Sequence, residues 1–296
     1  MTEYKKNHTL PKMMLKYWVD PGAPHESTHV YDIRKKKKFL STGRGKTAFS
    51  FAIQNDLHIP RIEGNRATAL EQWFSNLEGS LADFIRQAHN MKVPFSFRTN
   101  TGFTKAIMGL VALEYRSRYN LDLIQKQLWN DSRLLSDLTS GDGTEPKRAT
   151  LENLIHLVTE RATAIRPTKF EFLHAPADIS WITCDRPCLD LTWESAPAKL
   201  VVLTNKTIAI YQQSSCAEDI IRHTTLEDHK AVEATNRDIA LNARDWIVAD
   251  SACLLDQASC ITETTEWQES VDKDHLVEIP VDHLATGWRI GLPAED

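Results

Sequence analysis

The stretch THVYDIRKKKKFLSTGRGKTAFSFAI, residues 28–53, has the pattern of a strand, a charged turn and a second strand. Thr28, Val30 and Ile33 favour β structure, and a second apolar set runs over residues 48–53. The turn between them is the basic run of residues 34–38. The sequence therefore predicts a β-hairpin near the start of the chain.

A long helical pattern follows this hairpin. Between Arg66 and Asn90 the apolar residues recur at the spacing of one helix face, at Leu70, Trp73, Phe74, Leu77, Leu81, Phe84 and Ile85. Further helices are expected over residues 101–119 and 121–138, with another after a loop at residues 140–146. Together these segments predict a helical block over about residues 66–163.

β character returns after the helical block. The short strand candidates are residues 170–172, 181–183, 189–193, 200–203 and 207–211. A helix from Thr225 to about Arg244 follows, and then short strands and loops are expected over residues 246–288.

This order of elements predicts an α+β fold. We expect a mixed or antiparallel sheet from N- and C-terminal strands, packed against the central helical block. The chain is expected to be a single domain over residues 1–296, with β-rich parts at about residues 28–53 and 170–211. A separable helical domain is the alternative.

The composition is that of a globular protein, with 42% hydrophobic and 25% charged residues. The first residues lack the apolar segment of a signal peptide, and no uncharged apolar run approaches the roughly 20 residues of a membrane helix. The five cysteines show no paired Cys-x-x-Cys spacing. We therefore expect a soluble, cytoplasmic protein with reduced thiols and no membrane partner, whereas its oligomeric state stays open.

The net charge of −5 is unevenly distributed along the chain. Residues 1–50 carry eleven Lys and Arg against four Asp and Glu, so the remaining chain is strongly acidic. A basic end on an acidic body favours contact with a polyanion, which makes nucleic acid a candidate partner of the basic N-terminal region. The alternative is that residues 34–38 form only a solvated turn.

One segment ends like a phosphate-binding loop, Gly43-Arg44-Gly45-Lys46-Thr47. The full pattern requires a glycine five residues before Gly45, where this chain has Leu40, and the segment lies in the expected hairpin. The sequence also lacks the H-E-x-x-H and G-x-S-x-G patterns. The motifs therefore indicate neither a P-loop enzyme nor these hydrolase classes.

Polar residues near apolar helix faces are the informative positions, because burying them without a partner costs about 1–3 kcal/mol each. Glu71 and Glu78 are two turns apart at one edge of an apolar stripe, where they could share a cation or one could act as a base. They could equally be exposed boundary residues. Glu114 lies within the next apolar face and requires a cationic neighbour, which Arg116 or Arg118 could supply.

Three further positions come from other parts of the chain. Asn236 lies on the apolar stripe of the late helix, where an asparagine usually bonds to a nearby loop. Asp185 ends an apolar strand, and Arg186 is held extended by the following proline. His8, alone, would be an ordinary surface histidine.

Several segments in this order carry a resemblance: His8–Pro11 with Leu15 and Trp18, Val30–Asp32, Leu70-Glu71 with Leu77-Glu78, Leu113–Arg118, Trp181–Pro187, and Asn236. Together they resemble the uncharacterised family called domain of unknown function 4238, over most of residues 8–250. This chain departs from the family pattern in Glu114, which replaces a glutamine, and in Cys184 and Arg186 of the late turn. The resemblance implies a map of the chain and no activity.

Two classes of function fit these residues. The first is a metal-dependent nuclease or phosphodiesterase acting on nucleic acid. His8 would be its general acid or base, and Glu71, Glu78 and Asp185 would hold Mg²⁺ or Mn²⁺ or activate water. The substrate-binding residues would be Arg116, Arg186 and Asn236.

The second class is a non-catalytic sensor or protein-interaction protein, in which the same residues form a buried polar network. Thiol chemistry at Cys184 is the least favoured alternative, because the neighbouring Asp185 would raise the pKa of the thiol.

Overall fold

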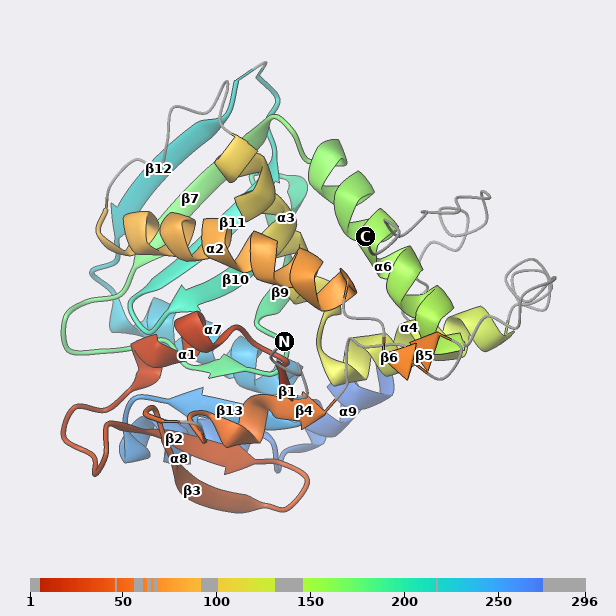
Figure 1. The fold of residues 1–296 in the computed structure, drawn as a ribbon. Coiled ribbons are helices and arrows are strands. Elements are labelled where there is room, and N and C mark those ends of the chain that lie inside the picture. Colours follow the sequence, from red (N-terminus) through yellow and green to blue (C-terminus); the bar gives the residue numbers. More distant parts are fainter. Residues whose placement is uncertain are drawn as a thin grey trace.

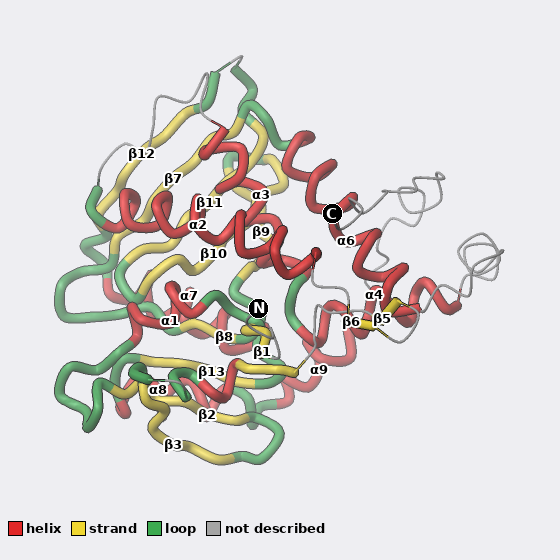
Figure 2. The backbone as a smooth tube through the Cα atoms, viewed as in Figure 1, coloured by secondary structure: helices red, strands yellow, loops and turns green. Residues whose placement is uncertain are grey.

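The computed structural model describes residues 6–45, 47–55, 61–62, 65–66, 69–91, 101–130, 146–216 and 218–273. Figure 1 and Figure 2 show helices lying against a large sheet, with a second sheet beside it. The α+β class is confirmed. The strands divide between two larger sheets, and the N- and C-terminal strands meet in the smaller of these.

The larger sheet has five strands in the order β12-β7-β11-β10-β9. Their bounds are β7 Thr168–His174, β9 Cys188–Trp193, β10 Ala196–Thr204, β11 Thr207–Gln213 and β12 Ile220–Thr225. Neighbouring strands are antiparallel except β12, which runs parallel to β7. The predicted strands at residues 170–172, 189–193, 200–203 and 207–211 all belong to this sheet.

Helices cover one face of this sheet (Figure 1). They are α2 Ala69–His89 and α3 Thr101–Tyr115, with α6 Pro146–Ala164 and α4 Arg118–Asn130 packed beside them. The contact is aromatic: the ring of Phe84 on α2 lies 5.4 Å from that of Phe170 and 5.6 Å from that of Phe172, both on β7. All three rings are fully buried, so the apolar stripe of the predicted helix is the face that packs on the sheet.

The smaller sheet has four strands in the order β3-β2-β13-β8. They are β2 Ser27–Asp32, β3 Lys37–Thr42, β8 Thr183–Cys184 and β13 Trp246–Ala249. A hairpin forms here, but its second strand is β3 and not residues 48–53, which lie mainly in a turn and a 3₁₀ helix. The chain reverses within the basic run, where the Asp32 side chain accepts the Lys35 amide, so that Lys37 already belongs to the strand. Strand β2 of the hairpin pairs with β13 from the far end of the described chain. The N-terminal strands therefore meet the late turn that contains Asp185.

Helix α8 (Ala252–Ile261) lies on one face of this small sheet. Lys38 of β3 reaches across that face to Asp256 of α8, 2.7 Å away. The neighbouring residue Lys37 belongs to the opposite face, because successive side chains of a strand alternate. Lys37 pairs with Asp32 of β2, which pairs in turn with Trp246 of β13.

The remaining elements lie outside these two sheets. They are β1 Lys6–His8, α1 Lys12–Leu15, a 3₁₀ turn Lys16–Trp18, a second Ser50–Ala52, β4 Ile53–Asn55, β5 Arg61–Ile62, β6 Asn65–Arg66, α7 His229–Asn242 and α9 Thr265–Lys273. Helix α7 contacts β8 of one sheet and β9 of the other. Strand β1 pairs with β4, which brings His8 beside the hairpin region.

Three further local predictions were wrong. The helix expected over residues 101–119 ends at Tyr115, and α4 begins at Arg118, where the Ser117 hydroxyl accepts the Asn120 amide (3.1 Å). Thr225 ends β12, and the late helix is instead capped by Asp228, whose side chain accepts the Lys230 amide.

The third wrong prediction is the C-terminal part. Residues 252–261 and 265–273 form α8 and α9 where short strands and loops were expected. The loop expected at residues 140–146 falls almost wholly outside the described residues, as does the chain after residue 273.

The glycine at position 43 is explained by close packing of the backbone, without a role in phosphate binding. A Cβ atom at this position would lie 2.7 Å from the backbone oxygen of Glu26, closer than any carbon tolerates. The glycine therefore lets the end of β3 approach the segment before β2. Among the described residues, no helix combines the length and apolar character needed to cross a bilayer.

Candidate functional site

Arg116 joins two of the other predicted site residues. Its guanidinium donates to the Glu78 carboxylate (2.7 Å) and to the backbone oxygen of His8 (2.8 Å). The same group lies 5.0 Å from the centre of the Phe74 ring. Arg116 is only 3% exposed, so this cation is enclosed between α2 and β1. The arrangement fixes the N-terminal segment on the helical layer.

His8 lies beside this ion pair. Burial lowers the pKa of its imidazole below the usual range, although a hydrogen bond with the Ala48 backbone and the charge of Glu78 oppose the shift. Its Nε2 atom is buried and has no hydrogen-bond partner among the described residues. Burial therefore favours the neutral form of the His8 imidazole.

The predicted metal ligands are not brought together as one set. Glu71 lies half-buried on α2, two turns before Glu78, whose carboxylate is engaged by Arg116. Asp185 binds the turn that precedes β13. Within the described residues, no group of three or more His, Cys, Asp or Glu side chains is arranged to hold a metal ion.

Glu114 has a different partner from the one expected. Its carboxylate accepts a hydrogen bond from the Tyr211 hydroxyl (2.5 Å) and lies 3.2 Å from Lys199. Arg116 pairs instead with Glu78, and Arg118 lies 3.6 Å from Asp122. The prediction that a cation must accompany Glu114 is confirmed, but the cation comes from β10.

Asn236 clamps the chain that leads into β8. Its side-chain oxygen accepts the Ile182 amide and its side-chain nitrogen donates to the Ser180 oxygen, each at 2.9 Å. Asn236 is 6% exposed, and both of its amide functions are satisfied by backbone. These contacts match the structural interpretation of a mid-stripe asparagine.

Asp185 holds the turn between α7 and β13. Its Oδ1 atom accepts the backbone amides of Arg244 (3.0 Å), Asp245 (3.0 Å) and Trp246 (3.3 Å). Asp185 is 2% exposed, and its Oδ2 atom has no hydrogen-bond partner among the described residues. Burial raises the pKa of Asp185, and the three amides oppose that shift.

The residues beside Asp185 are packed rather than open. Arg186 places its guanidinium 5.1 Å from the centre of the Tyr119 ring. Cys184 is fully buried, and its thiol lies 3.1 Å from the Arg186 oxygen. Burial and the charge of Asp185 raise the pKa of Cys184, which opposes thiolate chemistry.

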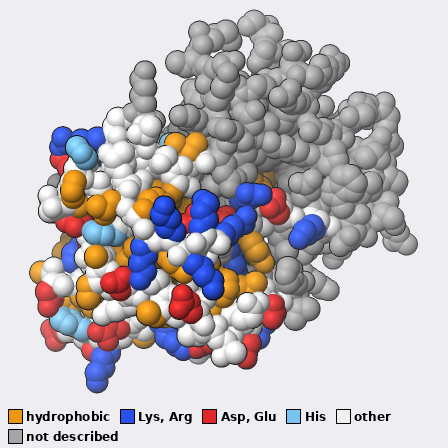
Figure 3. Space-filling view, turned by 90° about the horizontal axis from the view of Figure 1, so that it is seen from below, with side chains coloured by type: hydrophobic (Ala, Val, Ile, Leu, Met, Phe, Trp, Pro, Cys, Tyr) orange, Lys and Arg blue, Asp and Glu red, His pale blue; other side chains and the backbone are white. Residues whose placement is uncertain are grey.

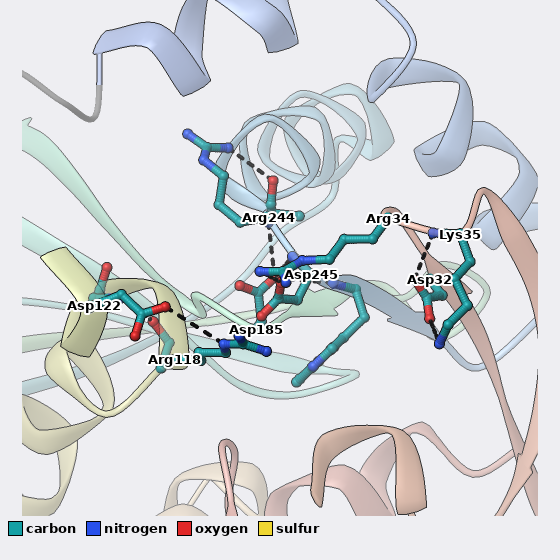
Figure 4. A network of polar contacts seen from close by, with 12 residues as sticks. Asp32, Arg34, Lys35, Arg118, Asp122, Asp185, Arg244 and Asp245 are labelled. Carbon is teal, nitrogen blue, oxygen red and sulfur yellow. Dashed lines mark hydrogen bonds and ion pairs between the residues drawn. The ribbon is translucent and has the colours of Figure 1, made fainter. Parts of the chain in front are cut away.

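Asp245 is the ionisable residue that the sequence interpretation missed. Its carboxylate lies next to that of Asp185 and 2.5 Å from the Arg34 guanidinium (Figure 4). Burial and the neighbouring Asp185 raise the pKa of Asp245 to about 6, while Arg34 and Arg118 oppose the shift. An Asp directly before a buried strand was the one available signal, and it does not distinguish Asp245 from other strand-flanking carboxylates.

Asp245 opens into a groove of about 600 Å³ on the face of the small sheet opposite α8. The groove is lined by cations and carboxylates (Arg34, Lys35, Lys37, Arg118, Asp32, Asp245) and by apolar and hydroxyl side chains (Val30, Phe39, Phe51, Trp246, Thr9, Ser50). Figure 3, viewed from the end that carries β2 and β3, shows Lys and Arg side chains gathered beside hydrophobic ones. The basic hairpin thus contributes directly to a concave surface.

A second cavity of about 870 Å³ lies between α7, α8 and the segment 177–180. Its lining mixes carboxylates with cations of similar number, and Lys206 is already engaged. The Lys206 ammonium donates to the backbone oxygens of Ala177 (2.9 Å) and Ile179 (2.5 Å). The second cavity has Lys206 and Arg237 against three carboxylates, whereas the sheet groove has four Lys and Arg against two carboxylates. We regard the sheet groove as the candidate site because of this positive excess.

Comparisons with known proteins add nothing to this geometry. No family model, no curated protein and no solved structure matches the chain. The resemblance to the domain of unknown function 4238 family stays a prediction, and function is argued from the residues.

Proposed function

We propose that this protein binds nucleic acid in the sheet groove and hydrolyses a phosphodiester there, with Asp245 as the proton donor. One observation carries the proposal: a carboxyl group whose pKa is raised to about 6 lines a groove together with Arg34, Arg118, Lys35 and Lys37. Groups whose pKa lies near the working pH are the ones that exchange protons efficiently in catalysis.

The cations of the groove would bind the phosphate. Lys37 and Arg118 are exposed, and Arg34 reaches the Asp245 carboxylate at 2.5 Å. Cationic side chains that neutralise phosphates release counterions, which supplies most of the sequence-independent affinity for nucleic acid. Both Arg34 and Arg118 act on the charge of Asp245, so a phosphate held by them would lie near this carboxyl group.

The chemical step would be attack of water on phosphorus with departure of the alcohol oxygen. Asp245, protonated at its carboxyl group, would give that proton to the leaving oxygen as the P–O bond breaks. The attacking water would lose its proton to solvent. Asp185 would be a positioning residue, because its contact with the Asp245 amide orients the turn. Mg²⁺ and Mn²⁺ remain proposed cofactors, to be tested as added components.

The test is a binding and cleavage assay on end-labelled RNA, single-stranded DNA and duplex DNA, with EDTA and with Mg²⁺ or Mn²⁺. Asp245→Asn should retain binding and lose cleavage. The matched control is Asp256→Asn, a carboxylate at 63% side-chain exposure beneath the same sheet, which should cleave like the parent. Cleavage that survives in Asp245→Asn would refute the proposed role.

The second candidate is a non-catalytic binding or sensor protein. It is favoured by the contacts of Arg116, Asp185 and Asn236, which all serve backbone segments or internal ion pairs. In that case the groove would bind nucleic acid, and no metal or pH condition would yield cleavage. Binding without cleavage in every condition therefore selects this candidate.

A further inference from the structure

We propose that the nucleic acid bound in the groove is single-stranded, and that one of its unpaired bases stacks on the wall formed by Phe39 and Phe51. This inference rests on the proposed binding function and names its substrate class. Lys and Arg alone could bind any polyanion, so the stacking contact is a separate claim from the electrostatic one.

The aromatic wall has a defined geometry. The Phe39 and Phe51 rings meet edge to face, with centroids 6.5 Å apart and planes inclined by 72°. Phe51 also contacts Trp246 edge to face at 5.0 Å. All three side chains line the groove, where Trp246 is 5% exposed and Phe39 and Phe51 are half-buried. A planar apolar ligand therefore has a surface to lie against.

The sheet register places this wall next to the cations. Lys37 and Phe39 are two residues apart on β3, so their side chains leave the same face of the sheet. They are roughly 7 Å apart along the strand, a span comparable with that from the phosphate to the base of one nucleotide. Asp32 and Val30 of β2 lie opposite them in register. A cation and an aromatic ring are thus aligned on one strand.

The combination favours a single strand over other polyanions. Aromatic side chains bordering a basic groove are the usual arrangement for single-stranded nucleic acid, in which each base has a free face. In a duplex both faces of a base are covered by neighbouring pairs. The volume of about 600 Å³ is that of a small-ligand pocket and suits a nucleotide rather than a double helix.

The experiment compares labelled oligonucleotides of equal length on the intact protein by fluorescence anisotropy: oligo(dT), oligo(rU), a duplex, and a strand of abasic sites. Because stacking of one base is worth roughly a tenfold change in affinity, oligo(dT) or oligo(rU) should bind about tenfold tighter than the abasic strand. Equal binding of the abasic strand or tighter binding of the duplex overturns stacking and leaves the proposed phosphodiester binding intact. Failure of every strand to bind overturns both.

Variants of the wall make the inference specific. Phe51→Leu and Phe39→Leu should weaken oligo(dT) binding about tenfold and leave abasic binding unchanged, while Phe39→Tyr should bind like the parent. The matched control is Leu40→Ala, because Leu40 is 46% exposed on the opposite face of β3. An equal loss for oligo(dT) and the abasic strand would overturn the stacking role.

Discussion

Asp185 accepts the backbone amide of Asp245 at 3.0 Å, and this contact places two carboxyl groups side by side at the turn between α7 and β13 (Figure 4). The two groups have different surroundings. Asp185 is enclosed and accepts three backbone amides, whereas Asp245 meets Arg34 and lines the groove. We infer that Asp185 stabilises the turn and that Asp245 is the carboxyl group available to a ligand in the groove.

Asp185→Ala should destabilise the protein strongly. The substitution leaves three buried amides, those of Arg244, Asp245 and Trp246, without their acceptor. Unsatisfied buried donors of this kind cost about 3 kcal/mol or more in total. Chemical denaturation should show the loss as a lower midpoint. Asp185→Asn keeps an acceptor oxygen, so its loss of stability should be smaller. An unchanged denaturation midpoint for Asp185→Ala would contradict the structural role.

Asp245→Asn should stabilise the protein above pH 6 and have little effect near pH 4. The folded-state pKa of about 6 exceeds the ordinary value, so the folded protein holds this proton more tightly than the unfolded chain. Stability therefore falls as pH rises from about 4 to 6 and stays lower above it, by at most about 3 kcal/mol. Asparagine removes that penalty.

Thermal unfolding across this pH range checks the prediction. The difference in melting temperature between Asp245→Asn and the parent should grow with pH. A constant difference would mean that the Asp245 carboxyl group does not titrate in this window.

Local periodicity accounts for the elements that sequence predicted well. The α2 stripe and strand β2 follow from spacings of 3.6 and 2 residues, which need no knowledge of the partner. The prediction placed the second strand of the hairpin at residues 48–53 instead of at β3, because the lysines that open β3 carry no β signal. The segment after residue 251 failed because its helices are short and have few periodic apolar residues. The helix predicted from Thr225 begins later, because residues 220–225 pair with β7 as strand β12.

The candidate site depended on contacts that periodicity does not encode. The expected burial of Glu114 predicted a cationic neighbour. That neighbour is Lys199, from a strand far along the chain, whereas the nearby Arg116 forms its ion pair with Glu78. Asp245 became distinctive only through its neighbours Asp185 and Arg34, which the sheet pairing brings together. A residue whose chemistry is set by long-range neighbours has no local signature.

Asn236→Asp should be more damaging than Asn236→Ala. The alanine leaves the Ile182 amide and the Ser180 oxygen without partners, at a cost of about 2 kcal/mol. The aspartate keeps the acceptor for Ile182 but places a second acceptor against the Ser180 oxygen, in a site that is 6% exposed. Equilibrium unfolding of both variants gives the comparison, and an aspartate variant as stable as the parent would show that this clamp is not rigid.

Arg116→Ala should cost about 3 kcal/mol, because it leaves the Glu78 carboxylate and the His8 oxygen without their donor. Glu78→Gln should cost less, since the Glu78 side chain is 32% exposed and the amide still accepts a hydrogen bond. A double-mutant cycle measures the coupling. Arg118→Ala, at an exposed position two residues away, is the control and should change stability by less than about 0.5 kcal/mol. If the stability losses of Arg116→Ala and Glu78→Gln are additive, the Arg116–Glu78 ion pair does not contribute to stability.

Lys37 and Lys38 allow the groove to be tested against simple surface charge. They are consecutive on β3 and both exposed, but Lys37 lines the groove while Lys38 pairs with Asp256 of α8 on the other face. Each phosphate contact contributes about 0.7 to the slope of log affinity against log salt for a single strand. Lys37→Gln should therefore lower that slope by about this amount, and Lys38→Gln should leave it unchanged. Each substitution removes one positive charge from the same strand, so equal slopes for the two variants would place the nucleic acid outside the groove.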